Sequence, residues 1–326
     1  LAWELTAAAH FVTFGFFLTM KKVLVAGEIN PDLILQGYHS FPEPGKEVLV
    51  DDFVMALGSA SAICAMGLAR LGRPVGFVGK VGVDPWGDYC LQTMAAAGID
   101  VSRVERNGAL KTGVTVSISS PRDRALVSFV GAMAALRGED LPDRLLADFH
   151  HLHVSSYFLQ EGLRPALPGV LARARRAGLT TSVDPGFDPR ERWGPDVLEA
   201  LREVDVFLPN EVELAALGGV ADPGEALRRL DNGRTRIVAK LGPRGCMTLD
   251  DARTLSAPAF PVAPVDTTGA GDSFNAGFLH AWLDGRPLPE CLRWGAACGS
   301  LSTRGVGGTA RQADAAEVEA LLRAAS

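Results

Sequence analysis

Hydrophobic positions along the chain form short apolar runs that alternate with segments of helical periodicity. The run Val23–Ala26 is continuous, as expected of a strand that is buried on both faces. Further strands are predicted at Val75–Val78, Leu152–Ser155, Thr180–Asp184, Val206–Leu208, Ile237–Lys240 and Met247–Leu249. Helices are predicted at Ala60–Leu71, Pro85–Ala97, Arg164–Ala177, Asp196–Arg202, Glu211–Leu217 and Gly224–Leu230. This alternation predicts an α/β fold with a largely parallel central sheet.

Two stretches interrupt the alternation, because they contain strand-like runs with no helix between them. They cover about residues 33–54 and 113–130. Within the second, Val114–Ser119 and Ala125–Val130 flank a short polar turn and so predict a hairpin. We interpret the two stretches as a small β lid, discontinuous in sequence, over the main sheet.

Composition narrows the class of protein. The chain has 326 residues, of which 47% are hydrophobic, enough for one large core with a small accessory subdomain. Its net charge is −6, whereas nucleic-acid-binding proteins usually carry an excess of basic residues, so the charge argues against this class. The five cysteines are scattered and form no C-x-x-C motif, so we expect reduced, mostly buried thiols in a cytoplasmic protein.

The first nineteen residues contain an apolar run from Ala7 to Leu18. A secretory signal would begin with basic residues, whereas Glu4 makes this start acidic, and the run is too short to span a bilayer. We interpret residues 1–19 as a non-native or disordered extension upstream of a start at Met20, with a weak membrane tether as the alternative. Residues 20–326 are interpreted as one domain with no membrane association.

The most informative segment runs from Asp266 to Leu279 and reads DTTGAGDSFNAGFL. From Ala270 onward its apolar residues follow helical spacing, so a helix is predicted to begin at GAGD. The first amides of a helix are unpaired and carry a partial positive charge. The small residues Gly269, Ala270 and Gly271 allow an anion to approach those amides closely.

An anion hole of this kind suits a transferring γ-phosphoryl group, whose charge is spread over its oxygens. Asp272 lies in the same turn, where a carboxylate can take the proton from an attacking hydroxyl. We therefore predict a small-molecule kinase in which Asp272 is the catalytic base and contacts the acceptor.

The whole fourteen-residue run resembles the C-terminal signature of the ribokinase-like, or pfkB, carbohydrate kinases. The resemblance extends from about Met20 to the end of the chain. It implies a three-layer α/β/α fold with a small β-sheet lid, ATP and Mg²⁺ as cofactors, and a sugar as acceptor. Lid sheets of relatives often form a dimer interface, so the resemblance also implies a homodimer through the lid.

The resemblance assigns the acceptor site to segments near the N-terminus. GEINPD, residues 27–32, resembles the family segment that binds substrate hydroxyls, which implies this role for Asn30 and Asp32. Gly58 begins the segment that resembles the N-terminal signature, but two positions depart from it. Ser59 replaces the second glycine, and Ile63 occupies the position of a substrate-contacting asparagine. Met133 likewise replaces an asparagine of relatives, so the pocket is expected to be more apolar.

The resemblance assigns the nucleotide and the metal to later segments. Asn210 and Glu213 match an N-x-x-E motif, which implies that they hold Mg²⁺ through its waters near the phosphates. Taken alone, the same residues are typical of a helix cap. The nucleotide-binding positions implied by the family are Asn210, Lys240, Gly242, Gly245, Gly271, Trp294, Ala297 and Cys298, although the last three are equally typical of a core. Some members bind a monovalent cation such as K⁺, and the matching positions are Asp266, Thr268, Ser300, Thr303, Gly305 and Thr309.

Other functions stay open at this stage. The apolar changes at Ile63 and Met133 favour a nucleoside kinase on the same scaffold. A catalytically silent nucleotide- or sugar-binding protein would not need the intact GAGD turn. An NAD-dependent dehydrogenase is disfavoured, because the glycine-rich run at residues 305–310 lies too near the end of the chain to open a βαβ unit.

Overall fold

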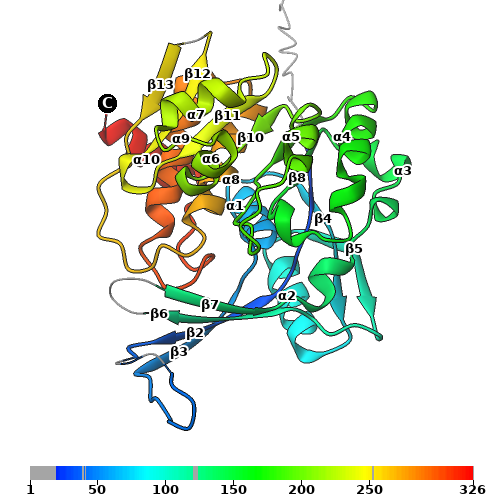
Figure 1. Ribbon diagram of the computed structural model, residues 1–326, viewed down its shortest axis with the longest axis vertical. Coiled ribbons are helices and arrows are strands. Elements are labelled where there is room, and N and C mark those ends of the chain that lie inside the picture. Colours follow the sequence, from blue (N-terminus) through cyan, green and yellow to red (C-terminus); the bar gives the residue numbers. More distant parts are fainter. Residues whose placement is uncertain (1–19, 39, 41, 120–123, 252, 326) are drawn as a thin grey trace, which may run out of the picture.

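The computed structural model describes residues 20–38, 40, 42–119, 124–251 and 253–325, which form two sheets of unequal size (Figure 1). Within this part of the chain the larger sheet has nine strands, in the order β13-β12-β11-β10-β9-β8-β1-β4-β5. Its strands are β1 (Val23–Ala26), β4 (Val75–Gly82), β5 (Asp100–Asn107), β8 (His151–Val154), β9 (Thr180–Val183), β10 (Val206–Phe207), β11 (Arg236–Lys240), β12 (Cys246–Asp250) and β13 (Arg253–Ala257). From β11 to β5 all neighbours are parallel, and β12 and β13 add an antiparallel edge.

Helices cover both faces of this sheet. Those of one face are α1 (Ala60–Arg70), α2 (Pro85–Ala96), α8 (Ala270–Leu283), α9 (Leu288–Ser302) and α10 (Ala315–Ala324). Those of the other are α3 (Asp143–Leu146), α4 (Leu167–Arg176), α5 (Asp196–Leu201), α6 (Glu211–Gly218) and α7 (Pro223–Leu230). The predicted three-layer α/β/α architecture is therefore confirmed.

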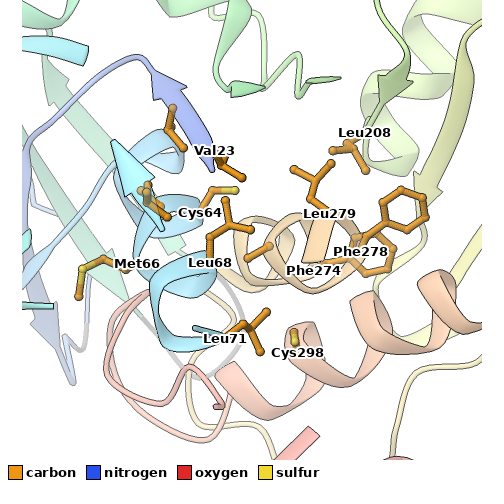
Figure 2. Packing of buried hydrophobic residues seen from close by; sticks show 14 of the residues in the cluster. Val23, Cys64, Met66, Leu68, Leu71, Leu208, Phe274, Phe278, Leu279 and Cys298 are labelled. Atoms are coloured by element: carbon orange, nitrogen blue, oxygen red, sulfur yellow. The ribbon is translucent and has the colours of Figure 1, made fainter. Parts of the chain in front are cut away.

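The central strand β1 shows why its apolar run is continuous. Val23 and Val25 belong to the hydrophobic cluster on the α8 side, whereas Leu24 and Ala26 belong to the cluster on the α4 side. Successive side chains of a strand point to opposite faces, so a strand between two helical layers must be apolar at every position. Figure 2 shows part of the first cluster, where side chains of α1 and α8 pack against each other.

Among the described residues, two strands and two α-helices were not predicted from the sequence. Strand β5 was missed because most of its side chains are polar and exposed, as is common at the edge of a sheet. Strand β13 at the opposite edge, the short helix α3 and the C-terminal helix α10 were also missed. The other boundaries agree with prediction to within a few residues.

The smaller sheet is the predicted lid, with strands in the order β3-β2-β6-β7. They are β2 (Pro31–Gln36), β3 (Asp52–Leu57), β6 (Val114–Ser119) and β7 (Arg124–Phe129). The predicted hairpin is confirmed as the antiparallel pair β6–β7, whose turn lies outside the described residues. In Figure 1 the lid projects from one end of the main body.

The interpretation of residues 1–19 as an extension falls on residues that lie outside the described part of the chain. Among the residues that are described, no helix combines the length and apolar character needed to cross a bilayer.

Two fully buried histidines of β8 form a chain of hydrogen bonds with neighbouring serine hydroxyls. His151 and His153 are adjacent on one face of β8, and the hydroxyl of Ser182 on β9 lies 2.7 Å from a ring nitrogen of each. The other ring nitrogen of His153 lies 2.8 Å from the Ser155 hydroxyl. Burial lowers the pKa of His153 to about 4, so the neutral ring is the folded form.

We predict that acid destabilises the fold through His153. When the pKa of a histidine is lower in the folded than in the unfolded state, protonation favours the unfolded state. The free energy of unfolding is therefore unaffected above the unfolded pKa, near 6.5, and decreases as the pH falls below that value. For His153 the loss reaches about 2 kcal/mol at pH 5. Urea unfolding of the wild type and of His153→Gln at pH 7.5 and pH 5 measures this term. The wild type should lose more stability between the two pH values, and equal losses would contradict the prediction.

Candidate active site

Four strand ends bring the polar residues of the site to one edge of the main sheet. Glu28, Asp184 and Asn210 follow β1, β9 and β10, and Lys240 ends β11. Strands β9, β10 and β11 are parallel neighbours, and β8 joins β9 to β1 in the same direction, so all four carboxyl ends lie at one end of the sheet. The beginning of α8 lies at the same edge, since Lys240 contacts residues of its first two turns. This is the usual place for a site in an open α/β sheet.

The start of α8 has the form that the sequence predicts. Gly269 caps the helix with a left-handed φ of 71°, and Ala270 is its first residue. A Cβ on Gly269 would lie 2.7 Å from the Cα of Gly308 and 3.0 Å from Cγ2 of Ile63. Both the backbone conformation and the packing therefore require glycine here. The amide of Ala270 donates to the carbonyl of Thr267 at 3.3 Å, and binding of an anion at this turn stays a prediction.

Asp272 lies in this first turn among other charged groups. Asp272 as a whole is half-buried, whereas its carboxyl group is surrounded by protein atoms. Burial, reinforced by repulsion from Asp184, Glu28 and Glu213, raises its pKa well above the usual range. Lys240 acts in the opposite direction. A carboxyl in this setting needs positive charge nearby to act as a base.

Lys240 is held by two residues that the sequence analysis missed. Its Nζ lies 2.5 Å from Oδ2 of Asp184, and Nδ2 of Asn275 donates to the same oxygen at 2.5 Å. The Oδ1 of Asn275 lies 3.3 Å from Nζ, so the three side chains form a closed group. Asp184 ends the predicted strand Thr180–Asp184, close to the sheet end where the acceptor residues after Ala26 lie, and that position was the signal that could have found it.

Asn210 and Glu213 form a reciprocal cap at the start of α6. The backbone amide and Nδ2 of Asn210 each donate to Glu213 at 2.7 Å, and the amide of Glu213 donates to Oδ1 of Asn210 at 2.9 Å. Burial and the nearby Asp184 raise the pKa of Glu213 to about 7. Both the cap and the family interpretation are thus compatible with the geometry.

The acceptor residues predicted from the sequence lie together beneath the lid. Nδ2 of Asn30 donates to Oδ1 of Asp32 at 3.1 Å and to Oγ1 of Thr115 at 3.3 Å. Asp32 lies on the inner face of β2, where it is 8% exposed. A Cβ on Gly58 would lie 2.0 Å from an oxygen of Asp32, so glycine at 58 lets the backbone approach this carboxylate.

Glu28 is a second functional candidate that the sequence analysis did not identify. Its carboxylate accepts from the amide of Ser61 at 3.1 Å and contacts the Ser61 hydroxyl at 2.6 Å, so it caps α1 from outside the helix. Nε2 of Gln160 donates to it at 2.6 Å. Ser59 has a φ of 64° and its hydroxyl donates to the carbonyl of Glu28 at 2.8 Å. This bond helps to hold a serine in a conformation that favours glycine.

The two positions expected to make the pocket apolar are both buried. Ile63 is 3% exposed and packs against Gly308 and Gly269, behind the turn that begins α8. Met133 is also 3% exposed and lies against Gly113. Contact of Ile63 with the acceptor stays a prediction, and its described packing supports the anion-hole turn.

The predicted nucleotide positions separate into two groups. Gly242 and Gly245 lie in the turn after β11 with φ of 57° and 90°, next to Lys240, and a Cβ on Gly271 would lie 3.5 Å from the lysine Nζ. Trp294, Ala297 and Cys298 instead lie in the core: Trp294 stacks on His280 at 5.0 Å, near the far end of α8. This placement favours the core interpretation of these three residues.

The predicted cation positions lie in loops that the structure joins. The carboxylate of Asp266 accepts from Thr268 at 2.9 and 2.7 Å and from the amide of Gly307 at 2.8 Å. The amide of Asp266 donates to the carbonyl of Thr303 at 3.1 Å, and the hydroxyl of Thr303 donates to the carbonyl of Ser300 at 2.8 Å. The remaining predicted positions, Gly305 and Thr309, follow Thr303 in the loop between α9 and α10.

Comparison with known proteins gives consistent matches. The model for "pfkB family carbohydrate kinase" matches residues 20–315. An ATP-dependent ribose-1-phosphate kinase from Halopiger xanaduensis is 33% identical over 286 residues, 87% of this chain and 92% of that protein. A fructokinase from Klebsiella pneumoniae is 35% identical over 271 residues, 77% of this chain and 86% of that protein.

A solved structure shows the same arrangement of elements. It is a double mutant of fructokinase from Vibrio cholerae O395, with fructose, ADP and a potassium ion bound. It is 25% identical, with a TM-score of 0.77 over 93% of this chain and 98% of that one. The family, the fold and the order of the sequence motifs therefore agree.

We predict that the two glycines at the start of α8 respond differently to alanine. Gly269→Ala places a Cβ against backbone at positive φ and should lower the free energy of unfolding by about 1–3 kcal/mol from strain alone. Gly271→Ala meets only the end of a lysine at an ordinary distance and should unfold near the wild-type denaturant midpoint. Urea unfolding of both variants measures this, and similar midpoints for the two would contradict it.

Proposed function

The chain belongs to the pfkB family of carbohydrate kinases, and from that premise we propose that it transfers the γ-phosphoryl group of ATP to a sugar hydroxyl with Asp272 as base. One observation carries the catalytic part of the proposal. A carboxylate lies in the first turn of a helix that begins with a glycine-rich segment, beside a largely buried lysine. Such a turn can hold a phosphoryl group and deprotonate its acceptor at the same point.

The residues of the site divide the reaction between them. Asp32, supported by Asn30 and Gly58, binds acceptor hydroxyls and orients one toward Asp272. As the acceptor oxygen forms its bond to the γ-phosphorus, its proton passes to Asp272 and the bond from phosphorus to the bridging oxygen breaks. The released ADP keeps that oxygen. The amides of Gly271 and Asp272 stabilise the charge on the transferring group.

The charge of the site fits a divalent cation that is bound mostly through water. Glu28, Asp184, Glu213 and Asp272 are opposed by Lys240. Burial raises the pKa of Glu28, and burial together with repulsion from other acids raises the pKa of Glu213 and Asp272. The described residues offer no cluster of three or more His, Cys, Asp or Glu side chains arranged to hold a metal directly. Asn210 and Glu213 would hold Mg²⁺ through its waters, and the ion would neutralise phosphate charge.

A monovalent cation beside the anion hole is part of the proposal. The loops of Asp266 and Thr303 are joined by hydrogen bonds and supply carbonyl and hydroxyl oxygens, which suit such an ion. The potassium ion in the related fructokinase supports this assignment.

A sugar is favoured over a nucleoside as acceptor. The preference for a nucleoside depended on apolar walls formed by Ile63 and Met133, and both side chains are buried away from the surface. The lid instead presents Asp32 and Thr115 with Asn30, a set that binds hydroxyls. ADP release with Mg-ATP against panels of sugars, sugar phosphates and nucleosides tests the assignment.

We predict that Asp272→Asn lowers kcat by about 10²–10⁴-fold, because it removes general-base catalysis. ATP affinity should change little, since the amides and Lys240 remain. Turnover by coupled ADP assay and nucleotide affinity by calorimetry separate the two effects. Asp205→Asn is the control, because Asp205 precedes β10 at the opposite edge of the sheet. Near-normal turnover of Asp272→Asn would remove Asp272 from the mechanism.

A homodimer through the lid completes the proposal. The strand register places Met55, Phe53, Val127 and Phe129 on the outer face of the lid, opposite the face of Asp32. These four side chains belong to residues that are 37–61% exposed. An apolar sheet face of this kind usually meets a partner.

We predict that Val127→Glu shifts the protein from dimer to monomer in sedimentation or size-exclusion experiments. The charge would have to be buried in the apolar interface. Leu198→Glu on α5 is the matched control, because Leu198 is 40% exposed on a helix of the main body. A wild-type monomer, or an unchanged dimer in Val127→Glu, would contradict the proposed interface.

A further inference from the structure

Asp184, Lys240 and Asn275, called here the lysine clamp, form a buried group that joins three elements of the site. Asp184 follows β9, Lys240 ends β11, and Asn275 lies in α8 one turn after Asp272. Asn275 is fully buried and Asp184 is 4% exposed. One oxygen of Asp184 accepts from both Lys240 and Asn275, and the other accepts from the amide of Gly186 at 3.0 Å. The ammonium group is thus fixed by a carboxylate that is itself fixed.

The clamp directs the lysine toward the anion hole. A Cβ on Gly271 would lie 3.5 Å from Nζ, and 3.8 Å from Cδ and Cε, so the lysine side chain extends along the residue that precedes Asp272. Asp184 and Asn275 each accept one hydrogen bond from the ammonium group. An ammonium group has three hydrogen-bond donors, so one donor remains for an anion held by the adjacent amides.

Lys240 is also the main positive charge that acts on the base. The charges that act most strongly on Asp272 are the acids Asp184, Glu28 and Glu213 and the base Lys240. Burial alone would lower the pKa of Lys240, but attraction to Asp184, Glu213 and Asp272 outweighs it and raises the pKa. The lysine therefore stays charged throughout the neutral range.

We propose that Lys240 is a catalytic residue that donates a hydrogen bond to the transferring phosphoryl group, and that Asp184 and Asn275 are positioning residues that aim it. This inference rests on the proposed kinase function. No covalent bond to the lysine forms or breaks, and it keeps its protons throughout. Its charge offsets the negative charge that develops on the phosphoryl oxygens, and its position beside Asp272 opposes the burial and repulsion that raise the pKa of that carboxyl.

The clamp makes opposite predictions for two variants, which damage to the fold would not produce. Lys240→Met removes a stabilising donor and should lower kcat by about 10²–10³-fold. It should also move the acidic limb of the pH–rate profile to higher pH, because Asp272 loses its cation. Asp184→Asn should lower kcat through poorer aiming of the lysine, yet move the acidic limb to lower pH, because a negative neighbour of Asp272 is removed.

Three further variants complete the test. Asn275→Ala should lower kcat without moving the limb, since Asn275 is uncharged, and Lys240→Arg should restore the limb position but only part of kcat. Lys80→Met is the matched control: Lys80 is also buried in the main sheet and paired with acids, Glu105 and Asp140. It should leave kcat and the limb unchanged. If Lys240→Met does not fold, the double variant Lys240→Met/Asp184→Asn removes both charges and should still lose kcat.

A measurement without substrate separates this inference from the kinase assignment. Carboxyl ¹³C NMR titration of the free protein should show the Asp272 pKa higher in Lys240→Met and lower in Asp184→Asn than in the wild type. A wild type that phosphorylates no acceptor in the panel would overturn the proposed function and the phosphoryl contact, while the titration still tests the electrostatic link. An active wild type with unchanged kcat and limb in Lys240→Met would overturn the clamp alone.

Discussion

The site depends on one constraint: several acidic side chains lie together where little water reaches them. Glu28, Asp184, Glu213 and Asp272 converge at the carboxyl edge of the main sheet with one lysine among them. Like charges at short range in a poorly solvated place cannot all ionise without compensation. The fold compensates them in different ways: Asp184 by Lys240, Glu213 by a helix cap, and Glu28 by the amide at the start of α1.

Asp272 is the acid that receives the least compensation from within the protein. Burial and repulsion from the other three acids raise its pKa, and attraction to Lys240 acts in the opposite direction. A site of this kind is poised for a ligand that brings positive charge together with phosphate. Burial disfavours the ionised form of Asp272. The positive charge of Lys240 in the lysine clamp offsets part of this effect.

Close helix packing places that base. Gly67 of α1 lies against α8, where a Cβ would come 2.7 Å from the Cβ of Ala276. Gly277 and Gly295 allow the same close approach between α8 and α9. Small residues at these crossings let the backbones come near and leave few alternative arrangements. These contacts fix α8 relative to α1 and α9. The lysine clamp then ties α8 to the ends of β9 and β11.

The sequence by itself determined the features that depend on neighbouring residues. The apolar run of β1 predicted a strand between two layers, and the GAGD turn predicted the start of α8. Turn and strand patterns predicted the lid hairpin β6–β7. Each of these follows from side-chain periodicity or from the conformational freedom of glycine, which act within a few residues.

Only the tertiary structure decided which polar groups meet. Lys240 finds Asp184 across 56 residues and Asn275 across 35, and Gln160 reaches Glu28 across 132. Ile63 matched a substrate-contacting position in the family pattern, yet it packs behind the anion hole because Gly308 leaves space there. Such contacts follow from the order of the strands and the spacing of the layers. Local patterns carry neither, so the sequence could single out Asp272 as a candidate base, whereas it could not predict the clamp beside it.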